Sequence, residues 1–219
     1  MHPASSANKR VAVRVAALAI LATSVAVGIL GCVSSKNEAP ATQLNLPSIK
    51  DSFAAKGIAG LDRLDQDEVQ RLCTEFADKP LPPAVSEKIQ LSQMATIKLP
   101  ASGKLIGDWK AGEALAQEGR GLQFSDKENG PQGGNCYACH QLTHEEISYG
   151  NLGPSLFNYG KLRGQSAAVS QYTYGKIYNS QAYSACSSMP RFGHNHILTP
   201  EQIADVVALL LDPQSPVNR

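Results

Sequence analysis

The sequence predicts an all-α fold, and three observations support this fold class. Apolar side chains in 65–77 recur at positions i, i+3, i+4 and i+7, which is the spacing of one helix face. The segment that begins at Thr199 combines a Thr-x-x-Gln capping box with proline at the first helical position, a typical helix start. No segment shows a clear strand pattern.

Residues 1–31 have the features of an export signal. Three basic residues precede a mostly apolar run of 16 residues at 15–30, shorter than the roughly 20 residues of a membrane-spanning helix. Ile29-Leu30-Gly31-Cys32 resembles a bacterial lipobox, in which Cys32 is lipidated and becomes the mature N-terminus. An uncleaved anchor helix and a plain secretory signal are the alternatives. All three export the rest of the chain, to a compartment that permits disulfides.

The charge balance argues against some classes of partner. The formal net charge of the chain is +1, and removal of the three basic leader residues leaves 17 basic against 19 acidic side chains. Nucleic-acid partners usually require a clustered basic face, and the sequence contains no such cluster. We therefore expect no nucleic-acid partner, and membrane contact only through a lipid at Cys32.

Three parts are expected after the leader. A polar, aperiodic stretch at 32–47 predicts a flexible tether that spaces the protein from the membrane. Helical patterns at 48–104 predict an N-terminal extension. The main domain is expected at 105–214.

Two helices are predicted in the extension. The first lies within 65–77, where Asp65 is the expected N-cap and Glu68 follows three residues later. The second runs from Pro83 to about Met94, with proline in its first turn.

The main domain is predicted to begin and end with a helix. The first spans 108–119 and contains Gly112, although glycine inside a helix costs about 1 kcal/mol relative to alanine. We therefore expect another helix to approach closely at Gly112. The last helix is expected at about 200–211, and 120–170 is interpreted as a glycine-rich, loop-heavy stretch.

The motif Cys136-Tyr137-Ala138-Cys139-His140 predicts one covalently attached haem c. Two thiols at this spacing reach the two vinyl groups of one porphyrin, and the histidine that follows lies beneath the iron. Half a zinc site and a redox disulfide are the alternatives. No second Cys-x-x-Cys or Cys-His pair stands at zinc spacing, and no βαβ pattern surrounds the motif.

The segment Gly153-Pro154-Ser155-Leu156 resembles the Gly-Pro-x-Leu segment that follows the haem motif in class I cytochromes c. This resemblance implies a class I cytochrome c-like fold for the main domain. It also implies that the Pro154 carbonyl accepts a hydrogen bond from His140, which would fix the orientation of the ring. A simple turn is the other interpretation.

Met189 is the candidate for the sixth iron ligand. It is the one methionine after the haem motif, and a thioether ligand favours ferrous iron and raises the reduction potential. Coordination by His140 and Met189 closes the iron to substrates, which suits one-electron transfer. His194 and His196 are rival ligands. If Met189 instead packs in the core and does not bind the iron, the iron has an open position, which suits a sensor or a peroxidase.

Arg191 and the tyrosines at 172, 174 and 178 are weaker candidates for the haem pocket, as partners of the haem propionates. Tyrosines at this spacing are more often half-buried packing residues.

Cys73 and Cys186 remain after the other cysteines are assigned. Two such cysteines in an oxidising compartment usually pair. A bridge between them would close a loop of about 110 residues, which is worth roughly 4–5 kcal/mol in the chain-entropy model. Two free thiols, or a Cys186 thiolate as iron ligand, are the alternatives.

Several segments together resemble SoxX, the monohaem cytochrome c subunit of the SoxAX complex of thiosulfate oxidation. The resemblance covers about 65–213, and its most specific parts are Gly-Asp-Trp-Lys-Ala-Gly-Glu and Met-Pro-Arg-Phe-Gly, which haem attachment alone does not require. The segments are 105–113, 119–121, 134–136, 150–156 and 189–193.

This resemblance implies an activity, an iron ligand pair and partners. The chain would be the electron-transfer subunit of an L-cysteine S-thiosulfotransferase, with His140 and Met189 as axial ligands. SoxA, a haem-thiolate cytochrome that carries the catalytic cysteine, would be its partner, SoxYZ the thiosulfate carrier, and a small cytochrome c the electron acceptor. The implied location is the periplasm, although many family members have ordinary cleavable signals rather than a lipobox. A stand-alone periplasmic electron shuttle, or a haem subunit of another oxidoreductase, is the alternative function.

Overall fold

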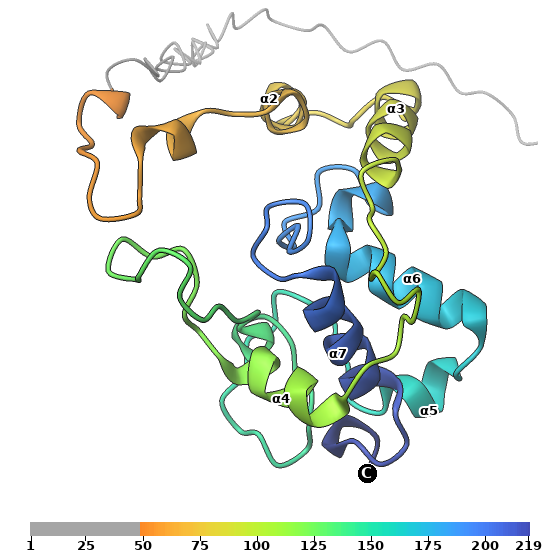
Figure 1. Ribbon diagram of the computed structural model, residues 1–219. Helices are drawn as coiled ribbons and strands as arrows, with labels where there is room; N and C mark the ends of the chain where they lie inside the picture. The colour runs from red at the N-terminus through yellow and green to blue at the C-terminus, as the bar shows by residue number, and fades with distance from the viewer. Residues whose placement is uncertain (1–48) are drawn as a thin grey trace, which may run out of the picture. The chain divides into compact units, whose positions relative to one another are not determined.

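The computed structural model describes residues 49–219. The expected leader, Cys32 and the expected tether at 32–47 lie outside the described residues. The described part is helical, and its β-structure is one isolated bridge between Lys56 and Ala59. None of its helices is long and apolar enough to cross a bilayer. The elements are η1 (Leu61–Leu64), α2 (Glu68–Glu75), α3 (Pro83–Met94), α4 (Trp109–Gln117), η2 (Cys136–Ala138), α5 (Tyr159–Arg163), α6 (Ala167–Tyr178), η3 (Ser180–Ala182), α7 (Pro200–Leu211) and η4 (Pro216–Asn218) (Figure 1).

The first amphipathic helix begins later than the sequence predicts. α2 starts at Glu68, and its N-cap is Asp67 rather than Asp65. The Gln70 N–H donates to the Asp67 carboxylate at 2.7 Å, and the Asp67 N–H donates to the Gln70 side chain at 2.9 Å. This reciprocal box satisfies two backbone donors. Asp65 instead lies at the end of η1.

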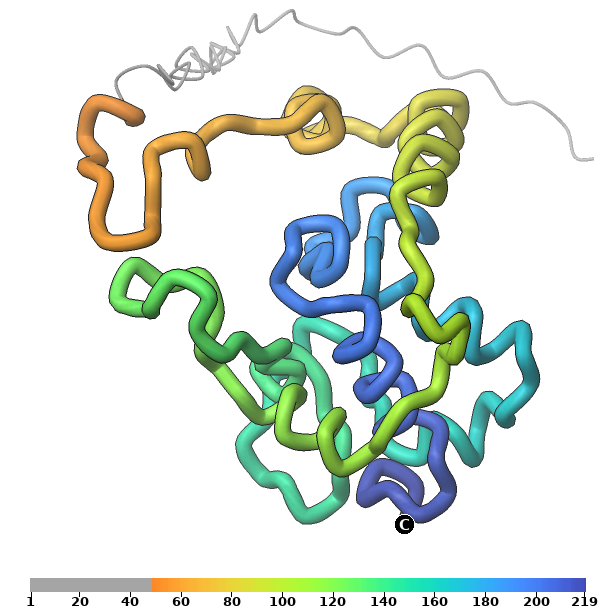
Figure 2. Tube along the Cα trace, in the orientation of Figure 1, coloured from red at the N-terminus to blue at the C-terminus, as the bar shows by residue number. Residues whose placement is uncertain are grey.

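α3 covers the predicted residues, with proline at its first position. Ile89 and Gln93 are its buried side chains. The chain then runs past α6 to the start of α4 (Figure 2). Along this path the Tyr174 hydroxyl of α6 donates to the Lys98 carbonyl at 2.7 Å. The end of the extension is therefore attached to the main domain by its backbone.

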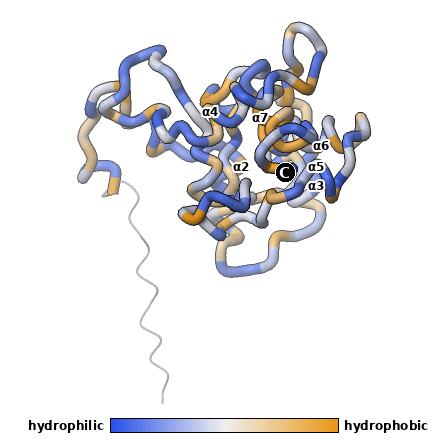
Figure 3. Tube along the Cα trace, turned by 90° about the horizontal axis from the view of Figure 1, so that it is seen from below, coloured by the Kyte–Doolittle hydropathy of each residue, from blue (hydrophilic) through white to orange (hydrophobic). Residues whose placement is uncertain are grey.

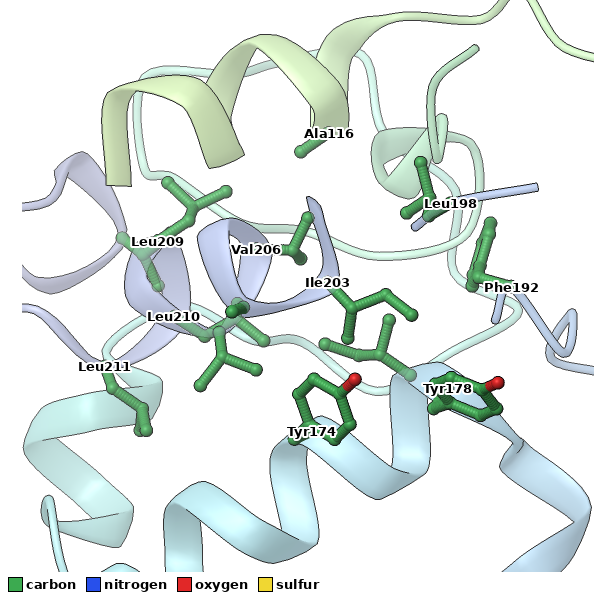
Figure 4. Close-up of a cluster of buried hydrophobic side chains, with 14 of the residues drawn as sticks. Ala116, Tyr174, Tyr178, Phe192, Leu198, Ile203, Val206, Leu209, Leu210 and Leu211 are labelled. Carbon is green, nitrogen blue, oxygen red and sulfur yellow. The ribbon is translucent and has the colours of Figure 1, made fainter. Parts of the chain in front are cut away.

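The core is built around α7. The capping box predicted at Thr199 and Gln202 is confirmed at its start. α4 packs on one side of α7 and α6 on another, so that Ala116 and Tyr174 face the same helix (Figure 4). Hydrophobic residues gather at α7 (Figure 3), which is expected for a helix that is covered on several sides. The hydrophobic core of the described part is thus centred on one buried helix, α7.

Gly112 lies where α4 packs directly against α7, which confirms the expectation of a nearby helix. A Cβ atom at this position would lie 2.1 Å from the Asp205 carbonyl oxygen, so no side chain fits. The residues just before α4 are bound to the same turn of α7. The Gly107 N–H donates to the Ala204 carbonyl at 3.0 Å, and the Asp108 N–H donates to the Asp205 carboxylate at 2.8 Å.

The stretch interpreted as loop-heavy contains two helices that the sequence prediction missed. α5 lies wholly within 120–170, and α6 begins there at Ala167. The Ser166 hydroxyl caps α6 by accepting from the Val169 N–H at 3.3 Å. Buried Ser170 and Thr173 interrupt the apolar pattern of α6, which explains why its periodicity is weak.

Candidate functional site

The histidine of the Cys-x-x-Cys-His motif is oriented by a backbone carbonyl. The Nδ1 atom of His140 lies 2.7 Å from the carbonyl oxygen of Pro154. A carbonyl can only accept, so Nδ1 carries the proton. Nε2 then has its lone pair free to bind a metal ion.

Three backbone hydrogen bonds join the motif to the segment that contains Pro154. The N–H groups of Gly150, Gly153 and Leu156 donate to the carbonyl oxygens of Tyr137, Cys139 and Gln141 respectively, each at 2.8 Å. The two glycines are required by this close approach. A Cβ atom would lie 1.9 Å from the Ala138 carbonyl oxygen at Gly150, and 2.1 Å from Cε1 of His140 at Gly153. The backbone of these two segments therefore fixes the position and the orientation of the imidazole ring.

Cys136 and Cys139 are free thiols at the edge of the core. Cys136 opens the short helix η2 and packs against the hydrophobic cluster, and burial raises the pKa of its thiol to about 12. Within residues 49–219, no three His, Cys, Asp or Glu side chains gather as a metal site. Two unpaired cysteines beside an imidazole with one free nitrogen fit covalent haem c.

Met189 contacts the same hydrophobic cluster from the segment between η3 and α7. Its side chain is half-buried. Its carbonyl accepts from the Ser180 hydroxyl at 2.5 Å, and its N–H donates to the Ser187 hydroxyl at 3.3 Å. Cys136 and Met189 therefore both lie against one hydrophobic cluster.

Cys73 of α2 and Cys186 form a disulfide, with their Cα atoms 5.4 Å apart. The bridge joins the N-terminal extension to the segment that precedes Met189. Cys186 adopts a φ of 61°, in the left-handed region that non-glycine residues rarely occupy. The structure therefore uses both thiols in the bridge and leaves no Cys186 thiolate for the iron.

An ion pair between the buried Arg191 and the partly exposed Asp67 makes a second connection between the extension and the Met189 segment. Arg191, which is 6% exposed, donates to the Asp67 carboxylate at 2.6 Å and to the Gln93 side-chain oxygen at 3.2 Å. Burial raises the pKa of Asp67, but the Gln70 N–H and the Arg191 guanidinium lower it by more, so its pKa lies below the ordinary value. The guanidinium of Arg191 is thus directed toward the extension.

The side chain of Asn179 extends this buried network. Its Nδ2 donates to the Gln93 side-chain oxygen at 3.0 Å and to the Thr96 hydroxyl at 2.9 Å. The rival ligand His194 lies near the ion pair, where burial lowers its pKa and Arg191 lowers it further. Sequence reasoning missed Asp67, Gln93 and Asn179, because nothing local marks the partners of a buried arginine.

The tyrosines considered for the haem pocket pack among themselves. Tyr174 and Tyr178 are buried and stacked, with ring centroids 6.1 Å apart. Tyr172 is exposed and meets the Tyr183 ring edge-on at 5.0 Å. Packing is therefore the observed role of these side chains.

Comparisons with known proteins agree with the geometry of the motif. Residues 110–212 match the family model described as Cytochrome c. The chain is 36% identical over 210 residues to a protein of Aquifex aeolicus (strain VF5) named "Uncharacterized lipoprotein", and the match covers 91% of this chain and 98% of that protein. Residues 110–212 therefore form a cytochrome c domain, with an all-α, class I cytochrome c-like fold and covalently bound haem c, and the chain belongs to one family with the Aquifex aeolicus protein.

Proposed function

We propose that this chain is the electron-transfer subunit of a SoxAX-type complex. In this role it accepts the two electrons released when thiosulfate is joined oxidatively to a cysteine of a SoxYZ carrier. It accepts them one at a time and passes them to a small cytochrome c. The alternative remains a stand-alone electron shuttle or a subunit of another oxidoreductase.

The observation that carries this proposal is the double attachment of the extension to the Met189 segment. The resemblance to SoxX runs from about residue 65 to about 213, so it includes both the extension and the haem domain. In a subunit of this type we expect these two parts to be held together. The Cys73–Cys186 disulfide and the Asp67–Arg191 ion pair join these two parts. Arg191 belongs to Met-Pro-Arg-Phe-Gly, one of the two most specific segments of the resemblance.

The haem site that we propose uses four side chains of this chain. Cys136 and Cys139 would hold the haem through thioether bonds, His140 would hold its iron through Nε2, and Met189 would supply a second protein ligand through its sulfur. Haem iron, when bound, supplies the one-electron redox step. Pro154 keeps the His140 ring in one tautomer and one orientation, at 2.7 Å. Ligation by both His140 and Met189 would leave no open position for a substrate, which would suit electron transfer.

The roles of the described cysteines support the proposal that the reactive thiolate belongs to a partner chain. In the part that the structure describes, two cysteines form the disulfide and the other two belong to the haem motif. The thiolate that reacts with thiosulfate is therefore proposed on the partner, a SoxA-like haem-thiolate cytochrome.

Coexpression with a SoxA-like cytochrome tests this function. We expect the two chains to copurify, and thiosulfate with SoxYZ to reduce the haem of this chain only when the partner is present. Replacement of the partner's ligating cysteine should abolish the reduction. A protein that stays monomeric in the presence of the partner, and whose haem is not reduced, would refute the proposal and favour the stand-alone shuttle.

We further propose a periplasmic location with a lipid anchor at Cys32. The lipobox-like Ile29-Leu30-Gly31-Cys32 and the similarity to a protein named a lipoprotein support this location. Cells grown with radioactive palmitate should label the wild-type protein but not Cys32→Ser. Equal labelling of both would contradict the anchor.

A further inference from the structure

We infer that the Asp67–Arg191 ion pair is a positioning device for the sixth iron ligand. Through Arg191, the first turn of α2 keeps the 186–193 segment in the conformation that presents Met189 to the iron. This inference rests on the proposed ligation by Met189.

The first step is the burial of Arg191. Its side chain is 7% exposed, and its two terminal nitrogens are bound by the Asp67 carboxylate at 2.6 Å and the Gln93 side chain at 3.2 Å. A buried guanidinium that loses its carboxylate is left as an uncompensated charge, which is strongly unfavourable. The segment that carries Arg191 would then move so that the charge regains water.

The second step is the short connection from Arg191 to Met189. Pro190 lies between them, and its ring fixes φ near −65°, which removes one of the few torsions that could absorb a movement of Arg191 before it reaches Met189. On the other side, the Met189 carbonyl accepts from the buried Ser180 hydroxyl at 2.5 Å. The backbone of Met189 is thus held by Ser180 on the core side and, through Arg191, by the extension.

The third step separates positioning from simple attachment. The Cys73–Cys186 disulfide already joins the extension to this segment, so the ion pair is not needed to keep α2 nearby. It lies two residues after Met189 along the chain, whereas the disulfide lies three residues before it. Together they bracket the proposed ligand, and the ion pair can be removed while the covalent link stays in place.

The test uses Asp67→Asn in the full-length protein loaded with haem. Asparagine caps a helix about as well as aspartate does, so this variant keeps α2 and removes the charge that pairs with Arg191. We expect the far-red absorption band of methionine-ligated ferric haem to weaken and the reduction potential to fall. Because imidazole competes with Met189 for the iron, its apparent affinity should rise about tenfold as the ligated conformation is depopulated.

Two further variants make the readout specific. Glu68→Gln removes a neighbouring carboxylate of α2, whose bond to Lys88 is solvent-exposed at 3.1 Å, and such pairs contribute little. It should leave the band, the potential and the imidazole affinity unchanged. Asp67→Glu restores the charge and should recover part of each property.

The outcomes distinguish this inference from the proposed function. A wild-type protein without the far-red band would overturn the ligation by Met189 itself. A wild-type protein with the band, and Asp67→Asn with an unchanged band, potential and imidazole affinity, would overturn the positioning role alone. If Asp67→Asn yields too little holoprotein, Arg191→Lys keeps a positive charge but loses the forked geometry. Arg191→Lys should then show a weaker band, a lower potential and a higher imidazole affinity, each to a smaller extent. Unchanged values of all three would equally overturn the inference.

Discussion

The Nδ1 atom of His140 lies 2.7 Å from the carbonyl oxygen of Pro154, 14 residues later in the chain. This hydrogen bond fixes which imidazole nitrogen is free for iron. It depends on close packing of the backbone against the ring, because Gly153 lies directly against the imidazole. The geometry of the proximal side is therefore set mainly by the main chain.

Substitution of Gly153 by alanine should disturb this arrangement. The new Cβ atom would lie 2.1 Å from Cε1 of His140, a distance that requires the ring or the backbone to move. Overpacking of this kind typically costs about 1–3 kcal/mol. We expect less haem bound per polypeptide and a shifted ferric absorption spectrum, both measured on the purified protein.

Gly119→Ala is the matched control for that experiment. A Cβ atom at Gly119 has its nearest neighbour at 3.7 Å, which is ordinary contact. This variant should bind haem as the wild type does. Equal haem content and identical spectra for both variants would show that the ring does not need the space beside Gly153.

The Cys73–Cys186 bridge should dominate the stability of the extension. It spans a sequence separation of 113 residues, and closing a loop of this length is worth roughly 4–5 kcal/mol in the chain-entropy model. Replacing both cysteines by serine should lower the free energy of unfolding by about that amount, as measured by chemical denaturation. Thiol counting on the denatured, oxidised wild-type holoprotein should find no reactive thiol from either cysteine, and two reactive thiols would contradict the bridge.

The sequence predicted the local features of the fold well, because each has a signal within a few residues. The capping box at Thr199 and the proline that opens α3 at Pro83 appear in the structure as predicted. α6 was missed because its buried face contains serine and threonine beside the apolar side chains, which weakens the helical period. The N-cap at Asp67 was missed because Asp65 offered an equally good local pattern two residues earlier.

The candidate site could be predicted only as far as its motif extends. Cys136, Cys139 and His140 stand in one pentad whose spacing matches a porphyrin, and the Pro154 segment follows shortly after. The partner of Arg191 is 124 residues away at Asp67, and no local pattern specifies a contact over that separation. Choosing between Asp67 and other carboxylates requires the packing of α2 and α3 against the Met189 segment.

Gly112→Ala provides a test of the contact between α4 and α7 in which two effects oppose each other. Alanine is favoured over glycine in a helix by about 1 kcal/mol. The added Cβ atom, however, would lie 2.1 Å from the Asp205 carbonyl oxygen, and a backbone atom cannot move without displacing α7. Because overpacking costs about 1–3 kcal/mol, we expect a net loss of up to about 2 kcal/mol in the free energy of unfolding, measured by denaturation followed by circular dichroism.

Ala114→Gly calibrates the helix-propensity part of that balance. Ala114 lies in the same helix but is exposed to solvent, so this substitution changes propensity without changing the contact with α7. It should lower the free energy of unfolding by about 1 kcal/mol. If Gly112→Ala were instead to stabilise the protein by the amount that Ala114→Gly destabilises it, the two helices would not be in contact at Gly112.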